Sequence, residues 1–399
     1  MKKLGPGLLV AAAFIGPGTI TTASVAGANF GFTLLWALVF SVFATILLQS
    51  MAARLAVVSG QGLAPALRDN INQPLLKYLA IFLVISAIGI GSAAYEAGNL
   101  SGASLGLQGL FGQQTGSLWT PVIALVSALL LYSGKYKLIE RTLMLLVGVM
   151  SIVFIATMVL AAPSFGELFA GFKPSLPTDS LTTVLALIGT TIVPYNLFLH
   201  SGVIAREDAK PQDVGQAIRT HNWDTGLSVG LGGLITLAIV ATASVAFFGQ
   251  HTGPLNAANM ANQLEPLLGS YAQYFFAIGL FAAGLTSAIT APLAGAYAVC
   301  GMLGGKDAVE DMRFKLVALA ILVFGTTVAS LGLDPVAVII FAQASNALLL
   351  PIVCIYLLWL LNNKNVMGQY KNNWLVNLLS LPIIITVVGL SAYKLVSLL

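Results

Sequence analysis

Long apolar runs constrain this chain more than any other feature of its sequence. Residues 143–162 and 316–331 carry no charged side chain. A helix of about 20 such residues crosses the roughly 30 Å hydrocarbon core of a bilayer. Only 8% of the 399 residues are charged, against about 25% in a soluble domain. The sequence therefore predicts an all-α integral membrane protein.

Polar and Gly/Pro clusters divide the chain into eleven predicted transmembrane helices. They lie near residues 6–26, 34–56, 76–100, 118–133, 139–162, 181–204, 223–248, 269–300, 314–333, 337–361 and 373–398. We expect a single transmembrane domain over residues 1–399. Five spans in 6–162 and five in 181–361 fit an inverted repeat, with 373–398 as an extra helix.

The positive charges predict an orientation for these spans. If the N-terminus is cytoplasmic, 16 of the 18 Lys and Arg residues fall on that side, and only Lys173 and Lys394 fall on the other. This bias is typical of membrane topology. We expect a bacterial inner (plasma) membrane protein whose surroundings are the lipid bilayer. The net charge of +4 gives no indication of nucleic acid binding.

Two predicted spans are interrupted at corresponding places. The first carries Gly16-Pro17-Gly18-Thr19, and the sixth carries Val193-Pro194-Tyr195-Asn196. A single proline usually only kinks a packed helix. Paired breaks in two halves are typical of secondary transporters, whose half-helix ends meet the substrate near mid-membrane. We therefore predict alternating access and a substrate site formed by Gly16, Pro17, Gly18, Thr19, Ile20, Thr21, Val193, Pro194, Tyr195 and Asn196.

Residues 188–201, IGTTIVPYNLFLHS, resemble the sixth-helix signature of the Nramp (natural resistance-associated macrophage protein) divalent-metal transporters. Pro17-Gly18 matches part of that family's first-helix motif, Asp-Pro-Gly-Asn, and the segment 283–287 resembles its eighth-helix Ala-Gly-Gln-Ser-Ser. Gln343 stands where the tenth helix of the family has a glutamine, and it joins the predicted site. The resemblance covers nearly the whole chain. It implies the LeuT-like fold, with helices 1 and 6 broken at mid-membrane.

The sequence departs from this family at positions that the resemblance implies are metal ligands. Gly16 stands in place of an Asp and Val193 in place of a Met; Thr19 replaces Asn, Tyr195 replaces His, and Ala93 replaces a third-helix Asp. Burying a divalent cation without a carboxylate is costly, whereas the start of a half-helix attracts anions. The expected substrate is therefore a small inorganic anion such as bicarbonate, with chloride, nitrate and formate also open.

Two other functions remain open at this point. One is a divalent metal ion transporter for Mn²⁺ or Mg²⁺, with or without proton coupling, which would recruit Glu96 as a ligand. The other is a transceptor that binds without moving its substrate. Metal titration by calorimetry would distinguish the hypothesis of a metal substrate from the hypothesis of an anion substrate.

Glu96 and His200 are predicted as gating or proton-path residues. Both match residues of the family, and intramembrane ionisable groups are functional candidates by default. Each is equally compatible with a purely structural role, as a hydrogen-bonded acid or a core histidine. Without Asp at positions 16 and 93, uncoupled transport is expected. No nucleotide-binding or catalytic motif occurs in a credible context, so we expect no enzyme activity, no cofactor, no resident metal and no obligatory protein partner.

Overall fold

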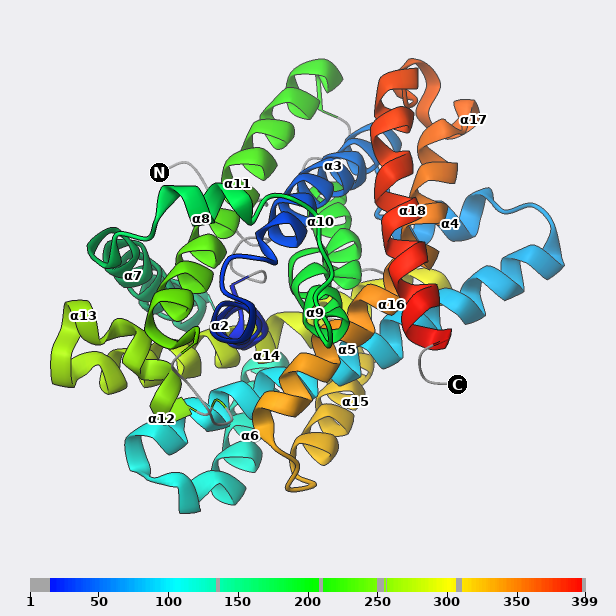
Figure 1. Cartoon of the computed structure of the whole chain (residues 1–399). Coiled ribbons are helices and arrows are strands. Elements are labelled where there is room, and N and C mark those ends of the chain that lie inside the picture. The colour runs from blue at the N-terminus through cyan, green and yellow to red at the C-terminus, as the bar shows by residue number, and fades with distance from the viewer. Residues whose placement is uncertain are drawn as a thin grey trace.

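The structure is a computed structural model that describes residues 15–133, 137–207, 211–249, 255, 257–305 and 311–396 (Figure 1). Within these residues the chain is helical and contains no strand. The α-helices are α2 (Pro17–Phe30), α3 (Leu35–Ser59), α4 (Leu63–Asn70), α5 (Pro74–Phe111), α6 (Gly116–Ser133), α7 (Lys137–Ala161), α8 (Phe165–Ala170), α9 (Leu181–Thr191), α10 (Pro194–Glu207), α11 (Val214–Phe247), α12 (Ala257–Met260), α13 (Glu265–Leu268), α14 (Ala272–Leu303), α15 (Met312–Ala329), α16 (Pro335–Asn362), α17 (Lys364–Met367) and α18 (Trp374–Val396). Short 3₁₀ turns, η1 (Gln113–Thr115), η2 (Ala261–Leu264), η3 (Gly269–Tyr271) and η4 (Gly368–Tyr370), complete them.

Eight helical segments in the described part of the chain are long and apolar enough to cross a membrane. Two shorter apolar helices, Leu118–Ser133 and Val147–Ala161, accompany them. Large apolar side chains are exposed on several of these helices, for example Leu129, Ile152 and Ile385, each at 61% or more. Such surfaces are compatible with lipid and not with water. The expected class, an all-α integral membrane protein, is confirmed by these spans.

Most helices lie close to their predicted positions, but two are longer. The helix predicted from residue 223 begins at Val214, because Asp213 caps it by accepting a 2.9 Å hydrogen bond from the Gln216 N–H. Its polar first turns therefore extend the helix beyond the apolar run that predicted it. The helix predicted to end near residue 100 continues to Phe111. The first predicted span overlaps residues 1–14, which lie outside the described residues.

Small residues allow the long helices α5 and α14 to pack closely. A Cβ added to Gly106 would lie 2.6 Å from the carbonyl oxygen of Ala277, and one added to Gly284 would lie 2.5 Å from the Cβ of Ala103. Such contacts are typical of membrane helices, where small residues let backbones approach. The helix α2 lies among α11, α9, α5, α16 and α14. Helices from both halves of the sequence therefore surround α2 (Figure 1).

Candidate functional site

The helix α2 begins at the first predicted break. Gly16 is its N-cap residue in an extended conformation, and Pro17 is its first helical residue, where a missing N–H costs no hydrogen bond. A Cβ at Gly102 of α5 would collide with the ring of Pro17. The start of α2 is therefore determined by the proline at its first helical position and by the close packing of α5 against that proline at Gly102.

The second predicted break lies between α9, which ends at Thr191, and α10, which begins at Pro194. Thr45 of α3 donates a 3.1 Å hydrogen bond to the carbonyl oxygen of Thr191. The Asn196 N–H donates to the Val193 carbonyl oxygen at 3.1 Å. The predicted interruption of this span at Val193-Pro194 is therefore present, and α3 helps to satisfy the groups that the break frees.

The two breaks lie against each other in the interior of the protein. The hydroxyls of Thr19 on α2 and Thr190 on α9 are 3.0 Å apart. Thr19 is fully buried and Asn196 is 2% exposed. The breaks are thus enclosed within the protein in this structure.

Buried oxygen and nitrogen atoms surround these breaks without hydrogen-bond partners. A Cβ added to Gly16 would lie 2.8 Å from Ser287 Oγ and 4.0 Å from Asn99 Oδ1, and one added to Gly18 would collide with the Gln343 amide. Ser287 Oγ, Asn99 Oδ1, Asn196 Oδ1 and both amide atoms of Gln343 have no partner. We call Asn99, Asn196, Ser287 and Gln343 the break cluster. Unpaired buried polar groups are rare and are candidates for ligand binding.

Glu96 lies beside the break cluster. It is the only fully buried acidic side chain among the residues described. Its Oε2 accepts a hydrogen bond of 3.4 Å from Asn99 Nδ2, and its Oε1 has no partner. A Cβ at Gly325 of α15 would lie 2.6 Å from the Glu96 Cγ, so the side chain passes along α15. Asn99 therefore connects the carboxylate to the start of α2.

His200 lies one helical turn after Asn196 on α10 and is 1% exposed. Its Nδ1 is 2.9 Å from Gln49 Oε1 of α3, and its Nε2 is buried without a partner. The histidine thus joins α10 to α3. Its contact is with Gln49, so the structure does not bring it together with Glu96 through any hydrogen bond of the described residues.

Three other predicted site residues pack in the hydrophobic core. Ile20, Val193 and Tyr195 belong to the hydrophobic core of buried side chains. The rings of Tyr195 and Tyr95 meet edge to face with centroids 5.1 Å apart. Thr21 is fully buried and its hydroxyl has no partner. Asn99 and Ser287 were missed by the sequence analysis as site residues, although Asn99 lies three residues after Glu96, the spacing that puts two side chains on one helical face.

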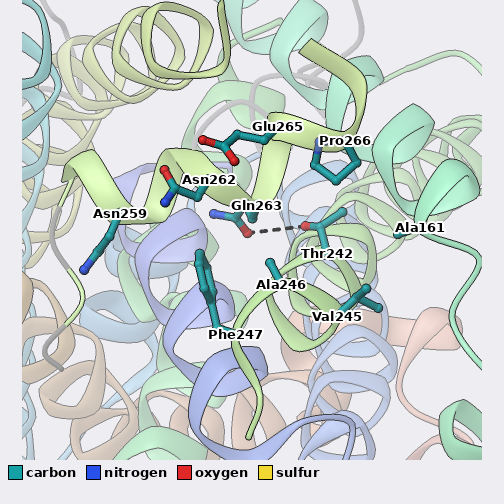
Figure 2. A pocket seen from close by; sticks show the side chains of 10 residues that line it. All are labelled: Ala161, Thr242, Val245, Ala246, Phe247, Asn259, Asn262, Gln263, Glu265 and Pro266. Atoms are coloured by element: carbon teal, nitrogen blue, oxygen red, sulfur yellow. Dashed lines mark hydrogen bonds between the residues drawn. The ribbon is translucent and has the colours of Figure 1, made fainter. Parts of the chain in front are cut away.

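A cavity of about 730 Å³ lies away from the breaks, between the ends of α7 and α11 and the segment from α12 to α13. Figure 2 shows Gln263 at its wall, bonded to Thr242. Gln263 is 1% exposed and also donates to Ser24 of α2 at 3.0 Å and to the Met260 carbonyl oxygen at 2.8 Å. Gln263 therefore lies at the wall of the cavity with its amide hydrogen-bonded, and it contacts the side of α2.

A conventional metal centre is absent from the described residues, since no three His, Cys, Asp or Glu side chains there come together. A cation at the breaks would be held by amide and hydroxyl oxygens, with Glu96 as the nearest identified carboxylate. Hard cations such as Mg²⁺ accept such oxygen ligands.

Comparison with known proteins finds similarity over nearly the whole chain. The profile of the family described as "Natural resistance-associated macrophage protein-like" matches residues 7–397. The chain belongs to the Nramp family. The divalent metal cation transporter MntH of Acidiphilium cryptum is 29% identical over 97% of this chain and 88% of its own length. The MntH of Staphylococcus saprophyticus is 30% identical over 98% of this chain and 91% of its own.

A solved structure supports the fold of this Nramp chain. The manganese transporter of Eremococcus coleocola, in complex with an aromatic bis-isothiourea substituted compound, superposes with a TM-score of 0.76. It is 24% identical, and the match covers 98% of this chain and 85% of that chain. The predicted LeuT-like fold is therefore confirmed.

The expected anion substrate, bicarbonate first, is wrong. The relatives are named divalent metal cation transporters. The expectation counted only the side chains at the two breaks, where no carboxylate occurs. The structure adds oxygen donors from α5, α14 and α16, and it connects Glu96 to them through Asn99. The sign of charge that the site accepts cannot be judged from the broken helices alone.

Proposed function

We propose that this protein is a secondary transporter for a divalent metal cation, which the break cluster binds. The observation that carries the proposal is the set of buried, unpaired oxygen atoms at the meeting of α2 with α9 and α10, in a chain whose relatives are named divalent metal cation transporters. Buried oxygens without a partner are energetically unfavourable. A cation that they coordinate supplies the missing interaction.

The chemistry of the ligands favours a hard cation. Asn99, Asn196, Ser287 and Gln343 offer amide and hydroxyl oxygens, and Val193 offers no donor at the second break. Oxygen ligands suit Mg²⁺ and Mn²⁺, whereas sulfur ligands select softer metals. We therefore propose Mg²⁺ or Mn²⁺ as the substrate, with discrimination against thiophilic ions such as Cd²⁺.

Glu96 is proposed to supply the negative charge for this cation. A divalent ion in a low-dielectric interior needs a counter-charge, because desolvation costs several kcal/mol per ion. The Glu96 carboxylate is fully buried and is bonded to Asn99, whose Oδ1 faces the start of α2. The ion would thus be held at the breaks by neutral oxygens, with the charge of Glu96 behind Asn99.

The remaining expectations about this chain are also proposals. We place it in the bacterial inner membrane with its N-terminus cytoplasmic, from the distribution of Lys and Arg. The five-plus-five repeat and the extra helix follow the predicted boundaries. His200 is proposed as a gating residue, because its bond to Gln49 joins α10 to α3, and that bond must change if these helices separate.

Metal flux into proteoliposomes tests the function. Vesicles that contain the purified protein and an internal Mg²⁺- or Mn²⁺-sensitive dye should take up at least one of these ions faster than empty vesicles. Glu96→Gln should lower uptake at least tenfold, since removal of one charge from a buried pair costs about 3–5 kcal/mol. Glu265→Gln, a substitution at an exposed acid of α13, serves as the control. No uptake of either ion by the folded protein overturns the proposal.

A further inference from the structure

The start of α18 is attached to α3 by a polar cluster at the end of the molecule away from the cavity of Figure 2. Arg54 of α3 donates to Asn372 Oδ1. The Asn372 N–H donates to the Leu361 carbonyl oxygen at 2.9 Å, and its side chain donates to Asn377 Oδ1 at 2.9 Å. Figure 1 shows α17 and the first turns of α18 beside the end of α3. Three segments of the chain thus meet around one asparagine.

This junction carries positive charge that no neighbouring acid neutralises. Arg54 has no carboxylate partner among the described residues, and its Nε is buried without a hydrogen-bond partner. Lys371 precedes Asn372, and Lys364 follows Leu361 by three residues, so both lysines lie next to the junction; both are exposed. The sequence from 312 to 399 has one acidic side chain, Asp334, which caps the opposite end of α16. Asp69 on α4 is paired with Arg68 at 2.8 Å.

The surface beside these cations is apolar. Trp374 is 75% exposed at the first residue of α18, and Leu375 and Leu378 follow it at 46% and 54%. A tryptophan at the end of a membrane helix lies at the level of the lipid headgroups. A ligand that binds at this junction must therefore place an anionic group near the cations and a hydrocarbon chain against α18.

We propose that Arg54, Lys364 and Lys371 form a binding site for the headgroup of an anionic phospholipid, whose acyl chains lie along α18. Basic pockets between membrane helices bind such headgroups, and each Lys or Arg near the surface strengthens the attraction. Arg54 provides a partly buried guanidinium, a planar group whose N–H donors suit phosphate. The site is independent of which ion the transporter carries.

Native mass spectrometry of the full chain in neutral detergent tests this site. We expect the protein to retain phosphatidylglycerol in preference to phosphatidylcholine with the same acyl chains. Lys371→Gln should weaken retention about fivefold, and the double variant Arg54→Gln with Lys371→Gln should weaken it about 25-fold, since each cation contributes roughly fivefold. Lys173→Gln, a substitution at an exposed lysine on the far side of the predicted topology, should leave retention unchanged.

Two further measurements keep the result interpretable. Lys371 is exposed, so Lys371→Gln should elute and unfold in lipid-free detergent as the unaltered protein does. Arg54→Gln also removes the hydrogen bond to Asn372, so the double variant is interpreted only together with the result for Lys371→Gln. Inorganic phosphate should not displace the lipid at millimolar concentration. Equal retention of the two lipids, undiminished retention by Lys371→Gln, or displacement by phosphate would each overturn the proposal.

Discussion

Two buried glutamines have opposite surroundings in this transporter. Gln263, at the wall of the cavity between α7, α11 and α13, bonds to Ser24, Thr242 and the Met260 carbonyl. Gln343, at the start of α2, has neither amide atom paired. Both side chains are 1% exposed or less. A buried amide with all its partners stabilises the fold, whereas an unpaired one is a cost that a ligand can remove.

Gln263→Ala is expected to have the largest effect on stability. The substitution removes three hydrogen bonds and leaves the Ser24 hydroxyl short of a partner inside the protein. The loss should be about 2–4 kcal/mol, seen as a lower midpoint of thermal unfolding in detergent. Asn262→Ala, a substitution at the exposed neighbour, is the control. An unchanged midpoint for Gln263→Ala would remove the contrast between the two glutamines.

Gln343→Leu should lower transport without lowering stability, in contrast to Gln263→Ala. Leucine has a similar volume and no unpaired amide, so thermal stability should stay the same or rise. Uptake of the divalent cation should fall more than tenfold, because one ligand of the proposed site is lost. Gln114→Leu changes an exposed glutamine and should alter neither quantity. If Gln343→Leu destabilised the protein and left uptake intact, Gln343 would be a structural residue like Gln263.

Thr19→Asp sharpens the assignment of charge at the break cluster. The new carboxylate would lie beside α9, where Thr190 Oγ1 is within 3.0 Å of the present hydroxyl. A divalent cation should bind more tightly, with a KM for uptake about tenfold lower, since an additional carboxylate offsets its charge. Thr19→Asn is the neutral control of the same shape. Equal KM values for the two variants would show that the ion does not approach α2.

Ser287→Ala should have the smallest of these effects. It removes one hydroxyl ligand facing Gly16, and about 1 kcal/mol for a neutral hydrogen-bonding group corresponds to roughly fivefold lower uptake. The hydroxyl of Thr290, one turn further along α14, is bonded to carbonyls of its own helix. Thr290→Val should therefore transport normally. A larger loss in Thr290→Val than in Ser287→Ala would contradict the position of the site.

Much of the fold could be predicted from local sequence, because apolar length and proline position determine membrane helices directly. The break at Val193-Pro194 follows from the position of the proline. The close packing of helices follows from the small residues in their sequences. The start of α11 could not be predicted from hydropathy, since its first turns are polar and depend on the cap by Asp213.

The site was predictable only in part. Gly16, Gly18, Thr19 and Gln343 come together at the breaks. Asn99 and Ser287 stand in continuous helices with no local signal, and they reach the site because α5 and α14 pack beside α2. Contacts between distant segments determine the charge of a cavity, so the inference from the breaks alone gave the wrong sign.

The hydrogen bonds of the main chain at the breaks have a consequence for the history of this protein. The carbonyl oxygens of Gly16, Thr191 and Val193 already accept bonds from Ile20, Thr45 and Asn196. The proposed break cluster binds the ion through side chains, which single codon changes can exchange while the scaffold persists. Evolution can therefore retune the cargo of such a carrier in small steps, without redesigning its architecture.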